Sequence, residues 1–315
     1  MGTAEESLAV EAVDAINDIA GIHPGYRAAH AKGSLWRGTF TATVDAARLT
    51  RAAHMQGQPI DATIRFSNGN GDPHAPDYAR DGRGMAVKFY LPDDTRTDIV
   101  ALTLPVFFAR TPGDFVEFTR ARRPDPETGQ PDLQRLGAFL GAHPEAQPAI
   151  QAALSAEPPA SYVRCVYHGI HAFRWVDEES DGRHLRYRWE PEEGVAAIDE
   201  DEARSRGPNY LQDEMIERIE RAPAAFRLAL QLAEDGDPVD DPTAAWPGER
   251  ETVIAGRLEI TAPERERERG GDVLVFDPTR VCDGIECSDD PVLRFRSRAY
   301  SVSVERRSAA VGPAA

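Results

Sequence analysis

The sequence is poor in cysteine, in positive charge and in long apolar runs. It holds 3 cysteines among 315 residues, an odd and low number that favours reduced thiols over a disulfide framework. Cys282 and Cys287 are not followed by histidines at zinc-finger spacing, so we do not expect a zinc site there. The chain has 53 acidic residues against 36 Lys and Arg. This balance argues against binding to nucleic acid, which requires a basic surface.

No segment approaches the roughly 20 consecutive apolar residues that cross a bilayer. The first residues lack the basic leader and apolar run of a secretion signal. We therefore expect a cytoplasmic protein without a membrane partner. Glycines at 69–71 and 82–84 lack the Lys-Ser/Thr ending of a phosphate-binding loop, so we interpret them as turn residues.

Hydrophobic periodicity predicts an α+β fold and not the regular βαβ winding of a parallel sheet. About eight strands with meander-like connections indicate an antiparallel eight-stranded β-barrel with α-helices outside. The charge run at 264–270 is predicted to be a solvated loop. Strands are predicted at residues 38–44, 62–67, 85–91, 98–108, 161–176, 183–190 and 251–261, and helices at 4–20, 45–55, 113–122, 131–141, 145–155, 208–235 and 288–307.

The stretch RFRSRAYSVSVERR, residues 294–307, gathers five arginines around one tyrosine. Helical offsets of four and seven place Arg296, Tyr300 and Arg307 on one face. A guanidinium about 4 Å from a phenol favours the phenolate by about 4 kcal/mol at an effective dielectric near 20. Arg296 could thus prepare Tyr300 as an anionic metal ligand, and Arg307 could neutralise a carboxylate. Spacing alone also allows a helix face of arginines paired with acidic neighbours.

Residues 276–307 resemble the proximal segment of haem catalases. The pattern consists of Phe-x-Pro, Gly-Ile-Glu, an Asp and Arg-x-x-x-Tyr, with an Arg seven residues after the Tyr. It is carried here by Phe276, Pro278, Gly284, Ile285, Glu286, Asp290, Arg296, Tyr300 and Arg307. Four further segments resemble the same family in the same order: YRAAHAKG (26–33), the strand-loop-strand at 64–90, the segment 97–115, and SYVRCVYHGIHAFRWV (161–176).

The resemblance implies a catalase-like barrel with haem b buried between the barrel and the C-terminal helix. It implies that Tyr300 binds the iron and that Arg296 supports the phenolate. His30 would act as the distal acid and base, oriented by Ser67, and Phe115 would stack on the porphyrin. Arg27, Arg65 and Arg307 would hold the propionates. The apolar stripe near the start predicts an N-terminal helix within residues 1–22, and the small residues at 309–315 predict a flexible tail. The resemblance implies that residues 23–308 form the haem-binding core.

One departure concerns the distal side. Ordinary catalases carry an Asn before Pro-x-Phe-Phe, and here Leu102 stands at that position, beside Thr103. A second hydrogen-bond donor over the iron is therefore missing, or Thr103 replaces it. We expect weak or no release of O2, while peroxidase turnover is less affected. Because the chain resembles the small, minimal catalase-related peroxidases, we expect no tightly bound NADPH.

The leading hypothesis is a haem peroxidase that reduces H2O2 or organic hydroperoxides with an organic electron donor. The sequence allows a homodimer and does not fix the oligomeric state. One alternative is rearrangement of a lipid hydroperoxide, as in relatives of the allene oxide synthase type. Those relatives carry Thr beside the distal His, where this chain has Ala29. A second alternative is a non-enzymatic protein that stores or senses haem in its barrel.

Overall fold

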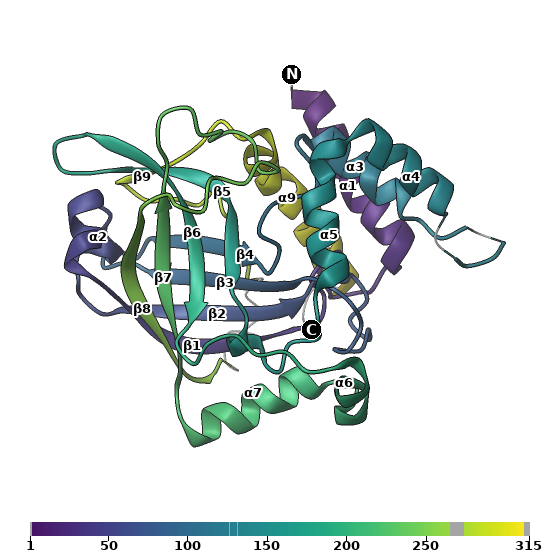
Figure 1. Ribbon diagram of the computed structural model, residues 1–315, viewed down its shortest axis with the longest axis horizontal. Helices are drawn as coiled ribbons and strands as arrows, with labels where there is room; N and C mark the ends of the chain where they lie inside the picture. The colour runs from purple at the N-terminus through teal and green to yellow at the C-terminus, as the bar shows by residue number, and fades with distance from the viewer. Residues whose placement is uncertain (1, 126, 131, 265–273, 312–315) are drawn as a thin grey trace.

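The computed structural model describes residues 2–125, 127–130, 132–264 and 274–311. Its centre is a closed antiparallel barrel of eight strands (Figure 1). This architecture confirms the predicted fold class. The strands are β1 (Gly33–Ala42), β2 (Ile60–Asn68), β3 (Arg83–Tyr90), β4 (Arg96–Leu102), β5 (Tyr167–Val176), β6 (Gly182–Pro191), β7 (Ala224–Leu232) and β8 (Thr252–Pro263).

The strands follow the order β4-β3-β2-β1-β8-β7-β6-β5, and β4 pairs with β5 to close the barrel. The closing pair is Leu102 opposite His168. A short strand, β9 (Ile285–Cys287), extends the sheet beyond β5. Closure pairs the two terminal strands with each other and so removes free edges that could template aggregation.

Alternation along the strands gives the barrel an apolar interior. On β2, Ile64 and Phe66 point into the main core, where Phe66 lies against Tyr162 and Phe226. The residues between them, Thr63, Arg65 and Ser67, point outward and are nevertheless buried. Polar side chains buried on the outside of a barrel need both a cover and hydrogen-bond partners. The buried polar residues on the outward face of β2 therefore indicate a functional site.

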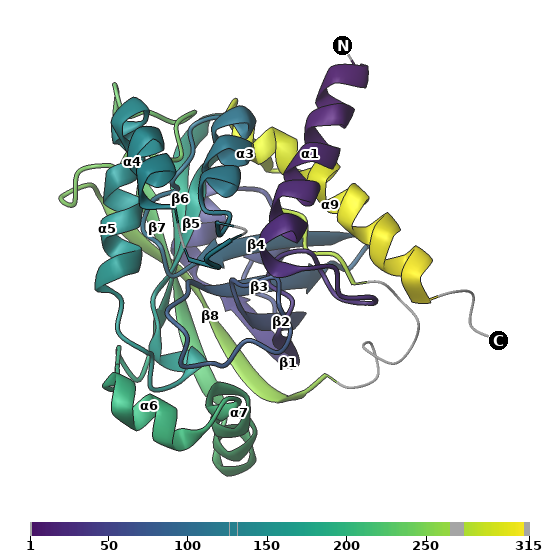
Figure 2. The same ribbon diagram turned by 90° about the vertical axis from the view of Figure 1, so that its right-hand side faces the viewer.

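Three helices form the cover on one side of the barrel. They are α1 (Gly2–Ala20), α3 (Pro112–Ala121) and α9 (Pro291–Val311), and α1 contacts both of the others (Figure 2). The three share a small apolar cluster, separate from the barrel core, made of Ala9, Ala12, Ala15, Val116 and Phe295. We refer to α1, α3 and α9 together as the helical cover.

The remaining helices lie around the barrel. Helices α4 (Leu133–Ala142) and α5 (Gln147–Ser155) stand near α3, whereas α6 (Glu200–Arg206) and α7 (Tyr210–Arg221) lie together at the opposite side (Figures 1 and 2). A short helix, α2 (Val44–Leu49), follows β1. Within the described residues, no helix is both long and apolar enough to span a membrane.

The predicted helix at 208–235 is wrong in its second half. Helix α7 ends at Arg221, Pro223 interrupts the chain, and Ala224–Leu232 is strand β7. Phe226, Leu228, Leu230 and Leu232 alternate into the core with period two. Leu and Ala have high helix propensity, and here the barrel environment overrides it.

Other predicted boundaries also shift. The strand at 98–108 ends at Leu102, and the strand at 161–176 starts only at Tyr167, after a short 3-10 turn. The predicted helix at 45–55 is α2 followed by a separate 3-10 turn, Ala53–Met55. Helix α9 continues to Val311, so residues 309–311 of the predicted tail are helical. Residues 312–315 and most of the charge run at 264–270 lie outside the described residues.

Candidate functional site

Tyr300 lies on α9 with its phenol oxygen held by Arg296, one helical turn earlier. Arg296 donates from Nε to the Tyr300 Oη at 2.9 Å and also donates to it from Nη2. Two N–H donors from one guanidinium on one phenol oxygen favour negative charge on that oxygen. The predicted pairing on one helix face is thus present, and Arg296 makes no ion pair with a carboxylate among the described residues.

Arg296 is positioned by a buried chain of polar groups. Its Nη1 lies 3.0 Å from Nε2 of His171, and Nδ1 of His171 lies 2.6 Å from Oδ2 of Asp290. Since the guanidinium can only donate, His171 accepts at Nε2 and carries its proton on Nδ1, which donates to Asp290. Burial lowers the pKa of His171, with the hydrogen bond and charge of Asp290 acting in the opposite direction.

Asp290 also begins helix α9. Its Oδ1 accepts from the backbone N–H groups of Val292 at 2.8 Å and Leu293 at 3.1 Å. Pro291 then occupies the first turn, where its missing N–H costs nothing. One carboxylate thus caps the helix that carries Tyr300 and anchors the chain of groups behind Arg296. The sequence motifs contained both Asp290 and His171 but gave them no role.

His30 lies in the segment before β1. It adopts a left-handed backbone conformation, with φ of 55°, which is uncommon outside glycine. Two hydrogen bonds hold its backbone: its N–H donates to Gly69 O at 3.1 Å, and its carbonyl accepts from Arg65 Nη2 at 2.8 Å. The strained conformation is therefore fixed from both sides, as is common where a side chain must be aimed.

The His30 ring pairs with Ser67 from the outward face of β2. Its Nδ1 lies 3.0 Å from Ser67 Oγ. Burial, followed by the charges of Arg65, Arg296 and Arg27, lowers the pKa of His30 to about 3. The imidazole is consequently neutral at neutral pH, and Nε2 is the ring nitrogen that faces away from Ser67.

The segment that carries His30 contacts the helix that carries Tyr300. Ala28 N donates to Ser303 Oγ on α9 at 3.3 Å, and the charges of Arg65, Arg296 and Arg27 all act on the His30 ring. Residues from α9, from the segment before β1 and from β2 are thereby brought together, although up to 273 positions separate them in the sequence, from Arg27 to Tyr300. The structure thus groups six predicted site residues: Arg27, His30, Arg65, Ser67, Arg296 and Tyr300.

Arg307 reaches the same region from the following turns of α9. It donates to Leu274 O at 3.4 Å, and Arg27 donates to the same carbonyl at 2.6 Å. Arg307 is half-buried, burial lowers its pKa, and it has no carboxylate partner among the described residues. A half-buried guanidinium on a neutral carbonyl leaves positive charge uncompensated. That charge fits the carboxylates of a porphyrin, just as the donor-held phenol of Tyr300 fits a ferric ion.

Phe115 lies on α3, at the edge of the helical cover. Its ring stacks on Phe107, with centroids 6.3 Å apart and an angle of 7°, and on Phe108 at 5.8 Å. It packs partly against the apolar cluster of α1, α3 and α9. A flat aromatic group here suits a flat apolar ligand. Within the part of the chain that the structure describes, the Phe115 ring does not stack on the ring of His30 or of Tyr300.

Leu102 lies on the outward face of β4, in the same row as Ser67 on β2 and Gly84 on β3. An apolar side chain thus occupies the row that carries the partner of His30. Thr103 is engaged elsewhere, because its Oγ1 accepts from Arg83 N at 3.0 Å and its own N–H donates to Arg83 O at 2.9 Å.

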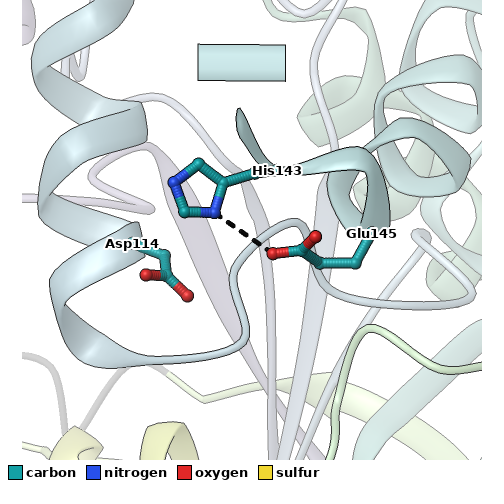
Figure 3. A group of neighbouring side chains, drawn as sticks. All are labelled: Asp114, His143 and Glu145. Atoms are coloured by element: carbon teal, nitrogen blue, oxygen red, sulfur yellow. Dashed lines mark hydrogen bonds and ion pairs between the residues drawn. The ribbon is translucent and has the colours of Figure 1, made fainter. Parts of the chain in front are cut away.

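A second cluster of possible metal ligands lies outside this site. Asp114, His143 and Glu145 bring their ligand atoms within 4.8 Å of one another (Figure 3). Nδ1 of His143 lies 3.1 Å from Glu145, and Nε2 lies 3.4 Å from Glu117. Burial opposes protonation, but Glu145, Asp114 and Glu117 outweigh it and raise the pKa of His143. Both ring nitrogens of His143 lie beside carboxylates, so we interpret the group as an ion-pair cluster between α3 and the turn after α4.

Comparison with known proteins supports the same family over nearly the whole chain. The sequence-family model described as Catalase matches residues 20–311. The catalase-related peroxidase of Mycolicibacterium paratuberculosis is 44% identical over 95% of this chain and 94% of that relative. The catalase-related peroxidase of Synechococcus elongatus is 35% identical over 95% of this chain and 88% of that relative.

Solved structures agree in fold. A fungal catalase matches with a TM-score of 0.79 and 26% identity, covering 92% of this chain and 60% of its own. Catalase A from Saccharomyces cerevisiae matches with a TM-score of 0.78 and 26% identity, covering 90% of this chain and 62% of its own. The chain thus spans less than two thirds of the length of these two catalases.

Proposed function

The chain belongs to the catalase family of oxidoreductases acting on peroxide, and we propose that it is a haem b peroxidase that uses an organic electron donor. Its peroxide is H2O2 or an organic hydroperoxide. The O–O bond breaks with two protons and two electrons, and the donor supplies the electrons. The products are two waters from H2O2, or one water and an alcohol from an organic hydroperoxide.

One observation carries the proposal: Arg296 serves both halves of the site. It donates two N–H groups to the Tyr300 phenol and also lowers the pKa of His30. The donor-held phenol of Tyr300 and the neutral imidazole of His30 are thus linked through one guanidinium. Catalase-family proteins bind haem, and this arrangement offers the ligand and the distal base that such a cofactor requires.

The residues that would hold haem b follow from their charge and shape. Tyr300 would bind the iron, Arg27, Arg65 and Arg307 would pair with the propionates, and Phe115 would lie against the porphyrin. When bound, the haem supplies an iron centre that accepts peroxide oxygen and passes electrons. Haem would then lie between the barrel and α9.

His30 would move the proton. With Nδ1 held by Ser67 at 3.0 Å, its neutral ring can accept a proton at Nε2 and return it to the departing oxygen. The low pKa of His30, about 3, keeps the ring neutral over the whole physiological range. Such acid–base assistance contributes roughly 10²–10⁴-fold to a rate.

Weak O2 release is the second part of the proposal. Oxidation of a second H2O2 requires that molecule to be oriented beside His30, and Leu102 offers no hydrogen bond in the row of Ser67. The hydroxyl oxygen of Thr103 already accepts from Arg83. An organic donor does not need this orientation, because it gives up electrons without binding to iron.

No observation favours rearrangement of lipid hydroperoxides, and the relatives named as peroxidases and catalases argue against simple haem storage. The organic donor and a homodimeric state stay predictions. The decisive test uses haem-loaded protein and compares dye oxidation by H2O2 in wild type and in Tyr300→Phe.

We expect Tyr300→Phe to lose the ferric tyrosinate spectrum and to lower dye oxidation at least 100-fold. Tyr78→Phe is the matched control, because its ring packs at the edge of the core under Arg204, away from this site. A Tyr300→Phe protein with an unchanged Soret band and unchanged activity would contradict the proposal. Dye oxidation by the wild type no faster than that by free haem would do so too.

A further inference from the structure

The His30 ring lies directly over Gly84, in a slot on the outward face of the barrel. Gly84 pairs with Ser67 on β2 and with Leu102 on β4, so the three residues form one row across three strands. Directly opposed residues in antiparallel strands project to the same face. Only Gly84 in this row has no side chain, and the imidazole occupies the space.

The fit leaves no room for a methyl group. A Cβ on Gly84 would lie 2.9 Å from His30 Nδ1, 3.0 Å from His30 Cε1 and 2.9 Å from Ser67 Oγ. These distances are well below the 3.5–4.0 Å of an ordinary non-bonded contact. The backbone of Gly84 is not in the left-handed region, so alanine is excluded by space and not by conformation.

His30 cannot withdraw as a whole, because its backbone is pinned. Its N–H is bonded to Gly69 O at 3.1 Å and its carbonyl to Arg65 at 2.8 Å. Its backbone also lies in the left-handed region, which is small and leaves little room for φ and ψ to change. An added methyl group would therefore tilt the ring outward, away from Ser67. The same methyl group would push the Ser67 hydroxyl in the opposite direction.

We propose that Gly84 is a positioning residue that sets the depth and orientation of the His30 imidazole and permits its hydrogen bond to Ser67. The steric part of this inference concerns only the protein. Its catalytic consequence rests on the proposed function, in which the depth of the ring fixes the distance from Nε2 to the peroxide.

The steric part is tested without haem by a double-mutant cycle on thermal stability. We expect Gly84→Ala to lower the Tm by several degrees, and His30→Ala/Gly84→Ala to recover at least half of that loss relative to His30→Ala. Gly82→Ala is the matched control, because a Cβ there meets no atom within 4 Å. If the two substitutions are additive, or if the double variant also fails to fold while His30→Ala folds, the inference is wrong.

The catalytic part is tested on haem-loaded protein. Gly84→Ala should lower kcat/KM for H2O2 by about 10–100-fold. It should also slow binding of hydrogen cyanide, which must give up its proton at the distal base, while the tyrosinate spectrum stays unchanged. A crystal structure should show the distance from Nδ1 to Ser67 Oγ lengthened beyond 3.5 Å. Kinetics and geometry equal to those of Gly82→Ala would overturn it.

Together, the two tests distinguish a failure of the steric role of Gly84 from a failure of the proposed peroxidase function. Coupling in the haem-free cycle with no peroxidase activity in the wild type would remove the proposed function and keep the steric role of Gly84. Peroxidase activity without coupling would keep the function and remove Gly84 from it.

Discussion

Leu102 projects from β4 toward the same outward face as Ser67, with only Gly84 between them. An amide at this position would offer an N–H donor beside the His30 ring. We therefore predict that Leu102→Asn raises O2 release from H2O2 by roughly 10-fold or more, with a smaller change in dye oxidation, because one well-placed hydrogen bond is worth roughly 1–1.5 kcal/mol. The measurement compares O2 evolution with dye oxidation on one haem-loaded sample.

Val100→Asn is the control for this substitution. Val100 lies on the same face of β4, one row away, opposite Ala86 instead of Gly84. It should leave the ratio of the two activities unchanged. An equal rise in O2 release in both variants would show that added polarity, and not its position beside His30, causes the effect.

At the scale of single residues, the sequence predicted the groups that motifs carry and missed those that only packing reveals. Arg296 and Tyr300 are four positions apart on one helix, so helical geometry was enough to pair them. His171 and Asp290 belong to β5 and to the start of α9, and their 2.6 Å contact depends on how that helix docks. Gly84 has no side chain to read, and its role appears only when the His30 ring is in place.

At the scale of elements, His143 joins α3 to the turn after α4. Its ring stacks on Phe139 at 4.3 Å and lies between Glu145 and Glu117. Asp114 lies near His143 and Glu145 (Figure 3). Because the pKa of His143 is raised on folding, its charge stabilises the fold fully below the unfolded pKa, near 6.5. That stabilisation is lost as the pH rises through the higher folded pKa.

We therefore predict that His143→Gln lowers the Tm below pH 6.5 and has little effect near pH 9. The loss should be at most about 3 °C, since partly exposed ion pairs are weak. Thermal unfolding of the wild type and the variant across this pH range measures the difference in Tm. The single substitution Glu145→Gln should reduce the pH dependence of the Tm. A difference that grows with rising pH would be the wrong sign for this cluster.

The elements themselves were predictable where one signal dominated. Helix α3 begins at Pro112, directly after the capping box of Thr111, and its predicted position, 113–122, is nearly correct. The prediction for the residues of strand β7 was wrong because Leu and Ala favour a helix. In the structure these residues alternate with period two and form part of the barrel. Strand β9 has three residues and exists only through its pairing with β5, which no local pattern encodes.

At the scale of the whole molecule, the described residues form three apolar clusters of unequal size. The largest fills the barrel, and a second holds α1, α3 and α9 together with three alanines, one valine and one phenylalanine. A third joins α3 to α4 and the turn after it through Phe118, Ala121, Phe139 and Ala146. The helical cover is further tied to the rest by polar contacts, such as Arg296 with His171 and Ala28 N with Ser303 Oγ at 3.3 Å. Elements with little buried apolar surface open locally before the global fold does.

If haem binds between the barrel and α9, it should stabilise the cover more than the barrel, because a ligand protects the elements that it bridges. We predict that haem loading slows amide hydrogen exchange in α9 and in residues 26–31 at least 10-fold, with little change in β6–β8. Exchange followed by mass spectrometry on haem-free and haem-loaded protein measures this. In Tyr300→Phe the added protection of α9 should be lost, since the iron no longer has its ligand on that helix. Uniform protection of barrel and cover, or protection of α6 and α7 on the opposite side, would place the cofactor elsewhere.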